Sequence, residues 1–168
     1  MIQVISGQEE KIVKLIDQER FHAFIPKKVK FLMRKGVKIR VYEPLFRGYV
    51  FVETDADALG FQAFLLERVK PLKEFVRVLR HREQDLETVY PEEKAWILKY
   101  CDKQMVIEPS IGYIEGDRIL ITEGPLVGQE HLIKRVNRHK RWVEVELMMF
   151  DQIQKLQLSC DIIQKLQD

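Results

Sequence analysis

The chain has 168 residues, of which 46% are hydrophobic, enough to build the core of one ordinary domain or of a medium domain and a small one. Charged residues make up 32%, but the net charge of +2 excludes a strong overall attraction to nucleic acid and leaves only local charge to be considered. No apolar run reaches the length of a membrane span, no signal peptide pattern opens the chain, and the two cysteines form no CxxC pair, so we expect a cytoplasmic protein without disulfides or membrane contact.

The beginning of the chain alternates between strand and helix patterns. Residues 1–5 and 21–25 are typical of short strands, the second ending at a proline. Between them, apolar residues recur at helical spacing and predict a helix over residues 7–20. Ser6 and Glu9 have the spacing of a capping box at the start of this helix.

The next segment combines a hairpin with an aromatic strand. Residues 29–42 predict a β-hairpin that turns at an Arg-Lys-Gly sequence. The strand PLFRGYVFVE, residues 44–53, ends in four consecutive β-favouring side chains, so we expect both of its faces to be buried. Gly48 indicates a kink or a close backbone approach. Phe46 and Tyr49 belong either to the core or to an apolar patch open to a partner, and the pattern does not decide between these interpretations.

Helix signals dominate the middle of the chain. A cap sequence, Thr-Asp-Ala-Asp, precedes a predicted helix over residues 56–67. Residues 76–79 indicate one more strand. A third helix is expected to open at Pro91, where two glutamates follow the proline and favour the positive end of the helix dipole.

The last third of the chain has an all-β pattern. Four short alternating runs cover residues 118–122, 132–136, 142–147 and 153–158. Closing so short a segment into a barrel would remove its exposed sheet edges. We therefore predict an α+β domain over residues 1–104, a linker over residues 105–112 and a small β-barrel domain over residues 113–168.

Two basic clusters stand out against the near-neutral total. The first lies on the predicted hairpin and consists of Lys27, Lys28, Lys30, Arg34, Lys35, Lys38 and Arg40. The second lies at a predicted turn between barrel strands and consists of Lys134, Arg135, Arg138, His139, Lys140 and Arg141. Such clusters bind phosphates with release of counterions, although lysines on a hairpin can also serve only to prevent edge pairing. The second cluster favours nucleic acid, because its planar side chains and the adjacent Trp142 can stack on bases.

Motifs for catalysis or cofactor binding are absent from the sequence. The glycines of GPLVGQE are not followed by the lysine of a phosphate-binding loop. Ser159, Cys160 and Asp161 adjoin, but no sequence pattern brings a histidine to them. The histidines form no metal-binding pattern. We therefore expect no catalytic residues, no metal, no cofactor and no enzymatic activity.

Three stretches resemble one known family. PLFRGYVFVE resembles the PLFPGYVFV strand in the N-terminal (NGN) domain of NusG-family transcription elongation factors. GDRILITEGPLVGQEHLIKRVN resembles the KOW motif of that family's C-terminal barrel, and QVISGQEEKI is similar to the family's opening strand and helix. The three occur in family order over nearly the whole chain. The resemblance implies an α+β fold: an NGN domain with an antiparallel sheet flanked by helices, and a small SH3-like KOW β-barrel.

The resemblance also implies a function without bond chemistry. An NGN domain would bind the clamp helices of the largest subunit of bacterial RNA polymerase through an aromatic-lined depression, and Phe46, Tyr49 and Val50 match that surface. The basic hairpin would face the non-template DNA strand near the transcription bubble. By bridging the polymerase cleft, such a factor suppresses pausing through preferential binding to one polymerase conformation. We expect it to act as a monomer.

Departures from the family pattern point to a specialised member. Arg47 stands where the family has a proline, and His131 replaces the second glycine of the KOW turn. Together with the dense basic cluster, they favour a LoaP-type paralogue, an antiterminator whose KOW domain binds an RNA hairpin. Two alternatives remain open: a general adaptor whose barrel contacts ribosomal protein S10 or the termination factor Rho, and an RNA-binding module with no polymerase contact.

Overall fold

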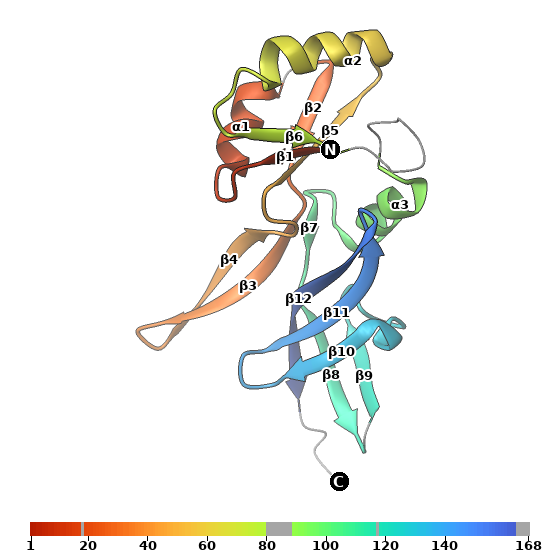
Figure 1. Cartoon of the computed structure of the whole chain (residues 1–168). Helices are drawn as coiled ribbons and strands as arrows, with labels where there is room; N and C mark the ends of the chain where they lie inside the picture. The colour runs from red at the N-terminus through yellow and green to blue at the C-terminus, as the bar shows by residue number, and fades with distance from the viewer. Residues whose placement is uncertain (18, 80–88, 117, 164–168) are drawn as a thin grey trace. The chain divides into compact units, whose positions relative to one another are not determined.

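A computed structural model of the chain describes residues 1–17, 19–79, 89–116 and 118–163 (Figure 1). Its architecture is α+β, as predicted. The chain forms two compact units, and each consists of two segments of sequence: Met1–Pro26 with Phe46–Tyr90, and Lys27–Leu45 with Pro91–Asp168. No helix in the part of the chain that the structure describes is long and apolar enough to cross a membrane.

The first unit is an antiparallel sheet with helices on one face. The strand order is β2-β5-β1-β6, with β1 at Ile2–Val4, β2 at Phe21–Phe24, β5 at Tyr49–Thr54 and β6 at Phe75–Val78. The helices are α1 at Glu9–Ile16 and α2 at Ala58–Phe64, which continues as a π-helical turn, η1, at Leu65–Val69. The predicted elements of this region are confirmed, with shifted ends. The Asp57 side chain caps α2 by accepting a 2.8 Å hydrogen bond from the Gly60 N–H.

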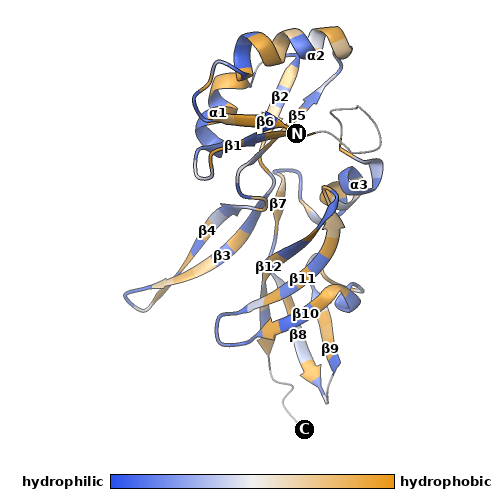
Figure 2. Cartoon of the chain, in the orientation of Figure 1, coloured by the Kyte–Doolittle hydropathy of each residue, from blue (hydrophilic) through white to orange (hydrophobic). Residues whose placement is uncertain are grey.

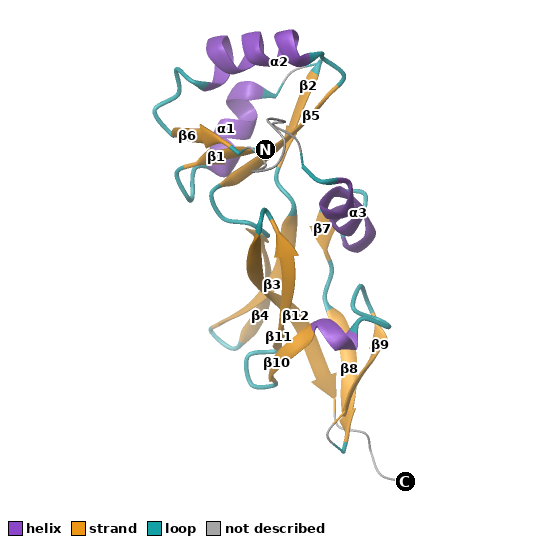
Figure 3. Ribbon diagram, turned by 45° about the vertical axis from the view of Figure 1, so that its right-hand side comes forward, coloured by secondary structure: helices purple, strands orange, loops and turns teal. Residues whose placement is uncertain are grey.

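The core of the first unit lies between the sheet and the helices (Figure 3). Ile2 and Val50 point from the sheet toward Ile12 of α1, and all three are completely buried. Phe21 stacks on Phe64 with ring centroids 4.1 Å apart, which joins β2 to α2. Strand β5 lies between β2 and β1, and its successive residues Val50 and Phe51, which point to opposite faces of the sheet, are both buried, as its continuous apolar sequence predicts.

The predicted capping box of α1 is wrong. The helix begins at Glu9 with Gln8 as its cap residue, and no side chain bonds to the helix end. The Glu9 side chain is buried and accepts a 2.6 Å hydrogen bond from the Gly48 N–H instead. Gly48 has φ +80°, and its carbonyl accepts a 2.8 Å bond from the Val4 N–H. The close backbone approach predicted at Gly48 is thus confirmed, and the buried carboxylate is used to hold it.

The second unit is built on a curled five-stranded sheet of half-barrel type, consistent with the predicted small SH3-like domain. The strand order is β10-β11-β12-β8-β9. The strands are β8 at Ser110–Glu115, β9 at Arg118–Glu123, β10 at Ile133–Asn137, β11 at Trp142–Met149 and β12 at Gln152–Ile163. A short 3₁₀ helix, η2, at Glu130–Leu132 precedes β10 and contains His131, so this position needs no glycine. Valine and glutamate alternate in β11 from Val143 to Glu146, and the strand then ends in three hydrophobic residues (Figure 2).

The hairpin of the first basic cluster belongs to this second unit. Strand β3 at Lys27–Arg34 pairs antiparallel with β4 at Val37–Pro44, as predicted. Strand β3 also pairs with β7 at Val106–Ile107, in parallel. Strand β7 and the start of β8 fall inside residues 105–112, which the sequence predicts as a linker. The turn-forming residues between these two short strands give the segment the composition of a linker, although much of it is strand.

Helix α3 at Pro91–Tyr100 opens at the predicted proline. The Tyr100 hydroxyl donates a 2.8 Å hydrogen bond to the Gln129 side chain, and Glu93 accepts one from the Phe150 N–H. After the helix, the Asp102 carboxylate accepts bonds from two N–H groups of the following turn. These contacts fix α3 to the sheet of the second unit.

Candidate functional site

The aromatic strand presents less apolar surface than the sequence suggests. Val50 is completely buried in the core of the first unit, and Phe46 is only 4% exposed, with its ring 6.1 Å from that of Phe51. Tyr49 is half-buried. In this conformation, therefore, Phe46 and Val50 do not form an open patch, because Val50 points toward the helices and Phe46 packs among neighbouring rings. Of the three residues, Tyr49 alone presents a substantial part of its side chain to solvent.

The first unit has exposed apolar residues that the sequence did not single out. Leu59 on α2, Leu66 on η1 and Val76 on β6 are each more than half exposed. Leu66 and Val76 line an open hollow of about 450 Å³, together with the cationic side chain of Lys70. The lining of this hollow combines apolar side chains with polar and cationic ones, such as Gln62 and Arg77.

The hairpin cluster is largely compensated by partners within the second unit. Lys30 pairs with Glu43 at 2.7 Å, Arg40 pairs with Glu108, Lys38 pairs with Asp161 at 3.2 Å, and the Lys28 ammonium donates to the Gln157 carbonyl at 2.8 Å. Burial lowers the pKa of Arg40, but the hydrogen bond and charge of Glu108 outweigh it, so that the pKa is raised. At least four of the seven cations of the first cluster therefore have a partner within the second unit.

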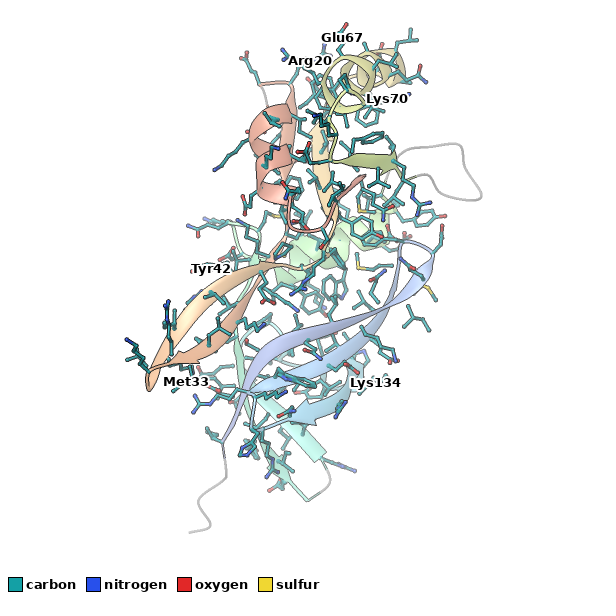
Figure 4. The ribbon with its side chains drawn as sticks, turned by 60° about the vertical axis from the view of Figure 1, so that its left-hand side comes forward. Arg20, Met33, Tyr42, Glu67, Lys70 and Lys134 are labelled. Carbon is teal, nitrogen blue, oxygen red and sulfur yellow. The ribbon has the colours of Figure 1, made fainter. Side chains whose placement is uncertain are left out.

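The outer end of the hairpin keeps its positive charge. Arg34 and Lys35 are exposed and have no charged partner among the described residues. Met33, which is 70% exposed, and Val37 lie beside them at the same end (Figure 4). The hairpin thus ends in two cations and an apolar pair.

The second basic cluster lies on β10, which carries Lys134 and Arg135, and in the following β10–β11 turn, which contains its other four residues. Its six cationic or titratable side chains are all exposed: Lys134, Arg135, Arg138, His139, Lys140 and Arg141. The Asn137 side chain accepts a 2.9 Å bond from the Lys140 N–H, which fixes the turn. The Arg135 guanidinium lies 5.8 Å from the centre of the Trp142 ring. The turn therefore has cations that can contact phosphates and planar side chains that can stack on unpaired bases.

One carboxylate connects the two clusters. Asp161 on β12 lies 3.2 Å from the Lys38 ammonium of the hairpin and 3.6 Å from Nε of Arg141 in the β10–β11 turn. The sequence predicts the two clusters in different domains, whereas the structure brings them together on the second unit. In the sequence Asp161 stands out only as a neighbour of Ser159 and Cys160, and no local pattern indicates this role.

The second unit also carries an exposed apolar pair. Met148 on β11 and Ile153 on β12 are register partners, and they are 67% and 61% exposed. Exposed apolar residues that lie side by side on a sheet are typical of a protein contact.

The described residues of the second unit form neither an activated nucleophile nor a metal site. The Ser159 hydroxyl donates a 2.7 Å hydrogen bond to the Val29 carbonyl instead of contacting a base. Burial, together with the Asp161 charge, raises the pKa of the Cys160 thiol to about 11, and burial raises that of Cys101 to about 12. Within residues 1–17, 19–79, 89–116 and 118–163, no group of three or more histidine, cysteine or acidic side chains could hold a metal ion.

Comparison with known proteins gives one family match. The family described as "Transcription termination factor nusG" matches residues 1–98. The matched segment contains all of the first unit, together with the hairpin β3–β4 and most of α3 from the second. The search of curated proteins found no match.

Proposed function

Because the chain belongs to the NusG family of transcription factors, we propose that it binds the clamp helices of RNA polymerase and acts as a processive antiterminator. In this proposal the N-terminal domain of residues 1–104 contacts the polymerase, and the barrel domain of residues 113–168 binds an RNA hairpin. In this proposal the factor acts by binding alone and catalyses no reaction. It suppresses pausing by binding one polymerase conformation more tightly than another.

The exposed basic segment from Lys134 on β10 to Arg141 in the β10–β11 turn is the observation that carries the RNA part of the proposal. Its cations project into solvent, and the ring of Trp142 lies beside the Arg135 guanidinium. A loop of this composition can neutralise phosphates and stack against bases that leave an RNA stem. These features favour the LoaP-type function over that of a general elongation factor.

For the polymerase contact, Tyr49 is the residue of the aromatic strand that a partner can reach without rearrangement of the first unit. Phe46 and Val50 are buried, and Val50 lies on the opposite face of β5 from Tyr49, so both would support this contact only through the packing of the strand. The polymerase-binding role of these three residues is proposed from the family to which the chain belongs.

The proposal is tested by transcription run-through with purified bacterial polymerase and a template that carries a terminator, with and without an RNA hairpin in the leader. We expect the wild-type protein to increase run-through, and the hairpin to increase it further. Replacing Arg138 and Lys140 by glutamine should remove the hairpin-dependent part. Tyr49→Ser should reduce both parts.

The matched control for the turn variant is Lys14→Gln with Arg68→Gln. These two exposed cations lie in the first unit and removing them changes the net charge equally. This control should behave as the wild type. If it loses as much hairpin-dependent run-through as the turn variant, the effect follows from total charge and the RNA contact is refuted.

A second candidate function is that of an adaptor whose barrel contacts ribosomal protein S10 or Rho. The exposed pair Met148 and Ile153 favours it, because apolar strand surfaces suit a protein partner. The substitutions Met148→Ser and Ile153→Ser should then abolish retention of S10 or Rho on the immobilised full chain, without changing RNA binding. Retention that survives these substitutions would argue against this surface.

A further inference from the structure

We propose that the outer end of the β3–β4 hairpin and the β10–β11 turn form one composite RNA-binding surface, which holds a single structured RNA. This inference deepens the proposed function and rests on its RNA contact. It differs from the expectation that the hairpin faces DNA while the turn binds RNA.

The hairpin is fixed to the sheet that carries the turn. The Ser159 hydroxyl of β12 donates to the Val29 carbonyl at 2.7 Å, and the Lys28 ammonium donates to the Gln157 carbonyl at 2.8 Å. Both bonds join β3 to the part of β12 that pairs with β11, residues 152–159. The backbone pairing of β3 with β7 adds a second attachment. The hairpin and the turn therefore belong to one body.

Asp161 brings the cationic parts of the two elements close together. One carboxylate oxygen of Asp161 contacts Lys38 and the other contacts Arg141, so both cations lie against the same side chain. Lys38 is the register partner of Met33, which directly precedes Arg34 and Lys35. A strand advances about 3.4 Å per residue, so the two uncompensated cations of the hairpin lie within a few residues' length of the turn.

The charges of the surface suit a phosphate backbone. The cationic side chains of Arg34 and Lys35 at the hairpin end, and of Arg138 and Lys140 in the turn, are exposed and form no ion pair among the described residues. Glu43 and Glu108 compensate Lys30 and Arg40 and thereby exclude them from this surface. The remaining cations come from two elements, as needed to contact phosphates on both strands of an RNA stem.

RNA is favoured over DNA because the turn adds Arg138, His139 and the neighbouring Trp142 to the charges. These planar groups can stack on unpaired bases of a loop or bulge. A duplex DNA without such bases would use only the cations.

The test measures binding of a fluorescein-labelled RNA hairpin to the full chain by anisotropy at several KCl concentrations. The hairpin variant carries Arg34→Gln and Lys35→Gln, and the turn variant carries Arg138→Gln and Lys140→Gln. Each should weaken binding by about tenfold or more at low salt and lower the salt slope by about two. The combined variant should lose about four from the slope, with one RNA bound per chain in the wild type.

The control variant, Lys14→Gln with Arg68→Gln, should retain the wild-type slope. If the hairpin variant binds like this control while the turn variant is weakened, the composite surface is refuted and the RNA contact of the turn stands. If the turn variant also binds like the control, the proposed RNA function fails as well. Equal binding of a DNA duplex with the same stem sequence would refute the assignment to RNA.

Discussion

The hydroxyl of Ser159 donates a 2.7 Å hydrogen bond to the carbonyl oxygen of Val29, two residues that lie 130 positions apart in the chain. Both residues are buried, so this bond is protected from water. It joins the hairpin predicted for the N-terminal domain to the last strand of the C-terminal sheet. The unit that results contains residues from both predicted domains, and its stability depends on such contacts.

Ser159→Ala should destabilise the second unit by about 1–3 kcal/mol, because it leaves the buried Val29 carbonyl without its donor. Urea unfolding followed by tryptophan fluorescence measures this effect, since both tryptophans, Trp96 and Trp142, lie in the second unit. Thr122→Ala is the control. It removes an exposed 3.2 Å bond to Ile111, and the loss should stay within about 0.5 kcal/mol. Equal losses in the two variants would contradict a role of the Ser159 bond in holding the hairpin.

The two glycines of GPLVGQE should respond differently to alanine. Gly124 has φ +93°, and a Cβ there would lie 2.6 Å from the Pro109 carbonyl oxygen. Gly128 has φ +71°, but a Cβ there would meet nothing within 4 Å. Gly128→Ala should therefore destabilise the second unit by about 1–2 kcal/mol through backbone strain alone. Gly124→Ala should add about 1–3 kcal/mol from crowding, which the same urea titration resolves. A smaller loss at Gly124 than at Gly128 would contradict the close packing of this turn.

The sequence predicts the local elements well, because each depends on residues close together in the chain. Pro91 sets the start of α3, and Gly48 sets the backbone approach in the aromatic strand. The pairing of β3 with β7 and the contacts of Asp161 were beyond prediction, because they depend on which distant segments meet. The sequence also could not predict whether Phe46 and Val50 are buried, because a core strand and an apolar binding strand have the same composition. Exposure of the basic turn, by contrast, follows from its polar sequence between two short strands.

Val50→Ala should destabilise the first unit by about 2 kcal/mol, because it removes methyl groups from a completely buried position. Tryptophan fluorescence does not report on this unit, so hydrogen exchange of the β1 and β5 amides is the suitable measurement. Val76→Ala, at a residue that is more than half exposed, should change protection by less than about 0.5 kcal/mol. A Val50 variant can therefore bind polymerase less well only because less of it is folded, so its binding must be compared at an equal folded fraction. An unchanged exchange rate in Val50→Ala would contradict its place in the core.

The Cys160 thiol should react slowly in the folded chain. Burial and the Asp161 charge raise its pKa to about 11, so about one thiol in a thousand is ionised at pH 8. In a Cys101→Ser background, we expect slow alkylation of Cys160 by iodoacetamide, measured by mass spectrometry, and faster alkylation when Ser159→Ala is added. Rapid labelling of the folded single-cysteine chain would contradict the closed packing of β12 against the hairpin.

The same pKa gives a pH dependence of stability. The thiol pKa in the folded chain, about 11, lies above its ordinary value of 9.0. The stabilisation of the neutral thiol is therefore fully present below pH 9 and is lost as the pH rises toward 11. In urea titrations, the free energy of unfolding of the Cys160→Ala variant should therefore fall less between pH 9 and pH 11 than that of the wild type. An identical decline in the variant would show that other groups cause it.

Asp161→Asn should strengthen RNA binding, because it removes the negative charge between Lys38 and Arg141 while keeping the size of the side chain. We expect the salt slope to increase by about one, as the released cations become available to phosphate. Stability should change by less than about 1 kcal/mol, since both ion pairs are partly exposed. Glu123→Gln on β9 removes the same charge from the opposite edge strand of the sheet and serves as the control. If both variants strengthen binding equally, net charge explains the gain. If Asp161→Asn weakens binding, the carboxylate instead organises Lys38 and Arg141 for the RNA, and the compensating role assigned to it is wrong.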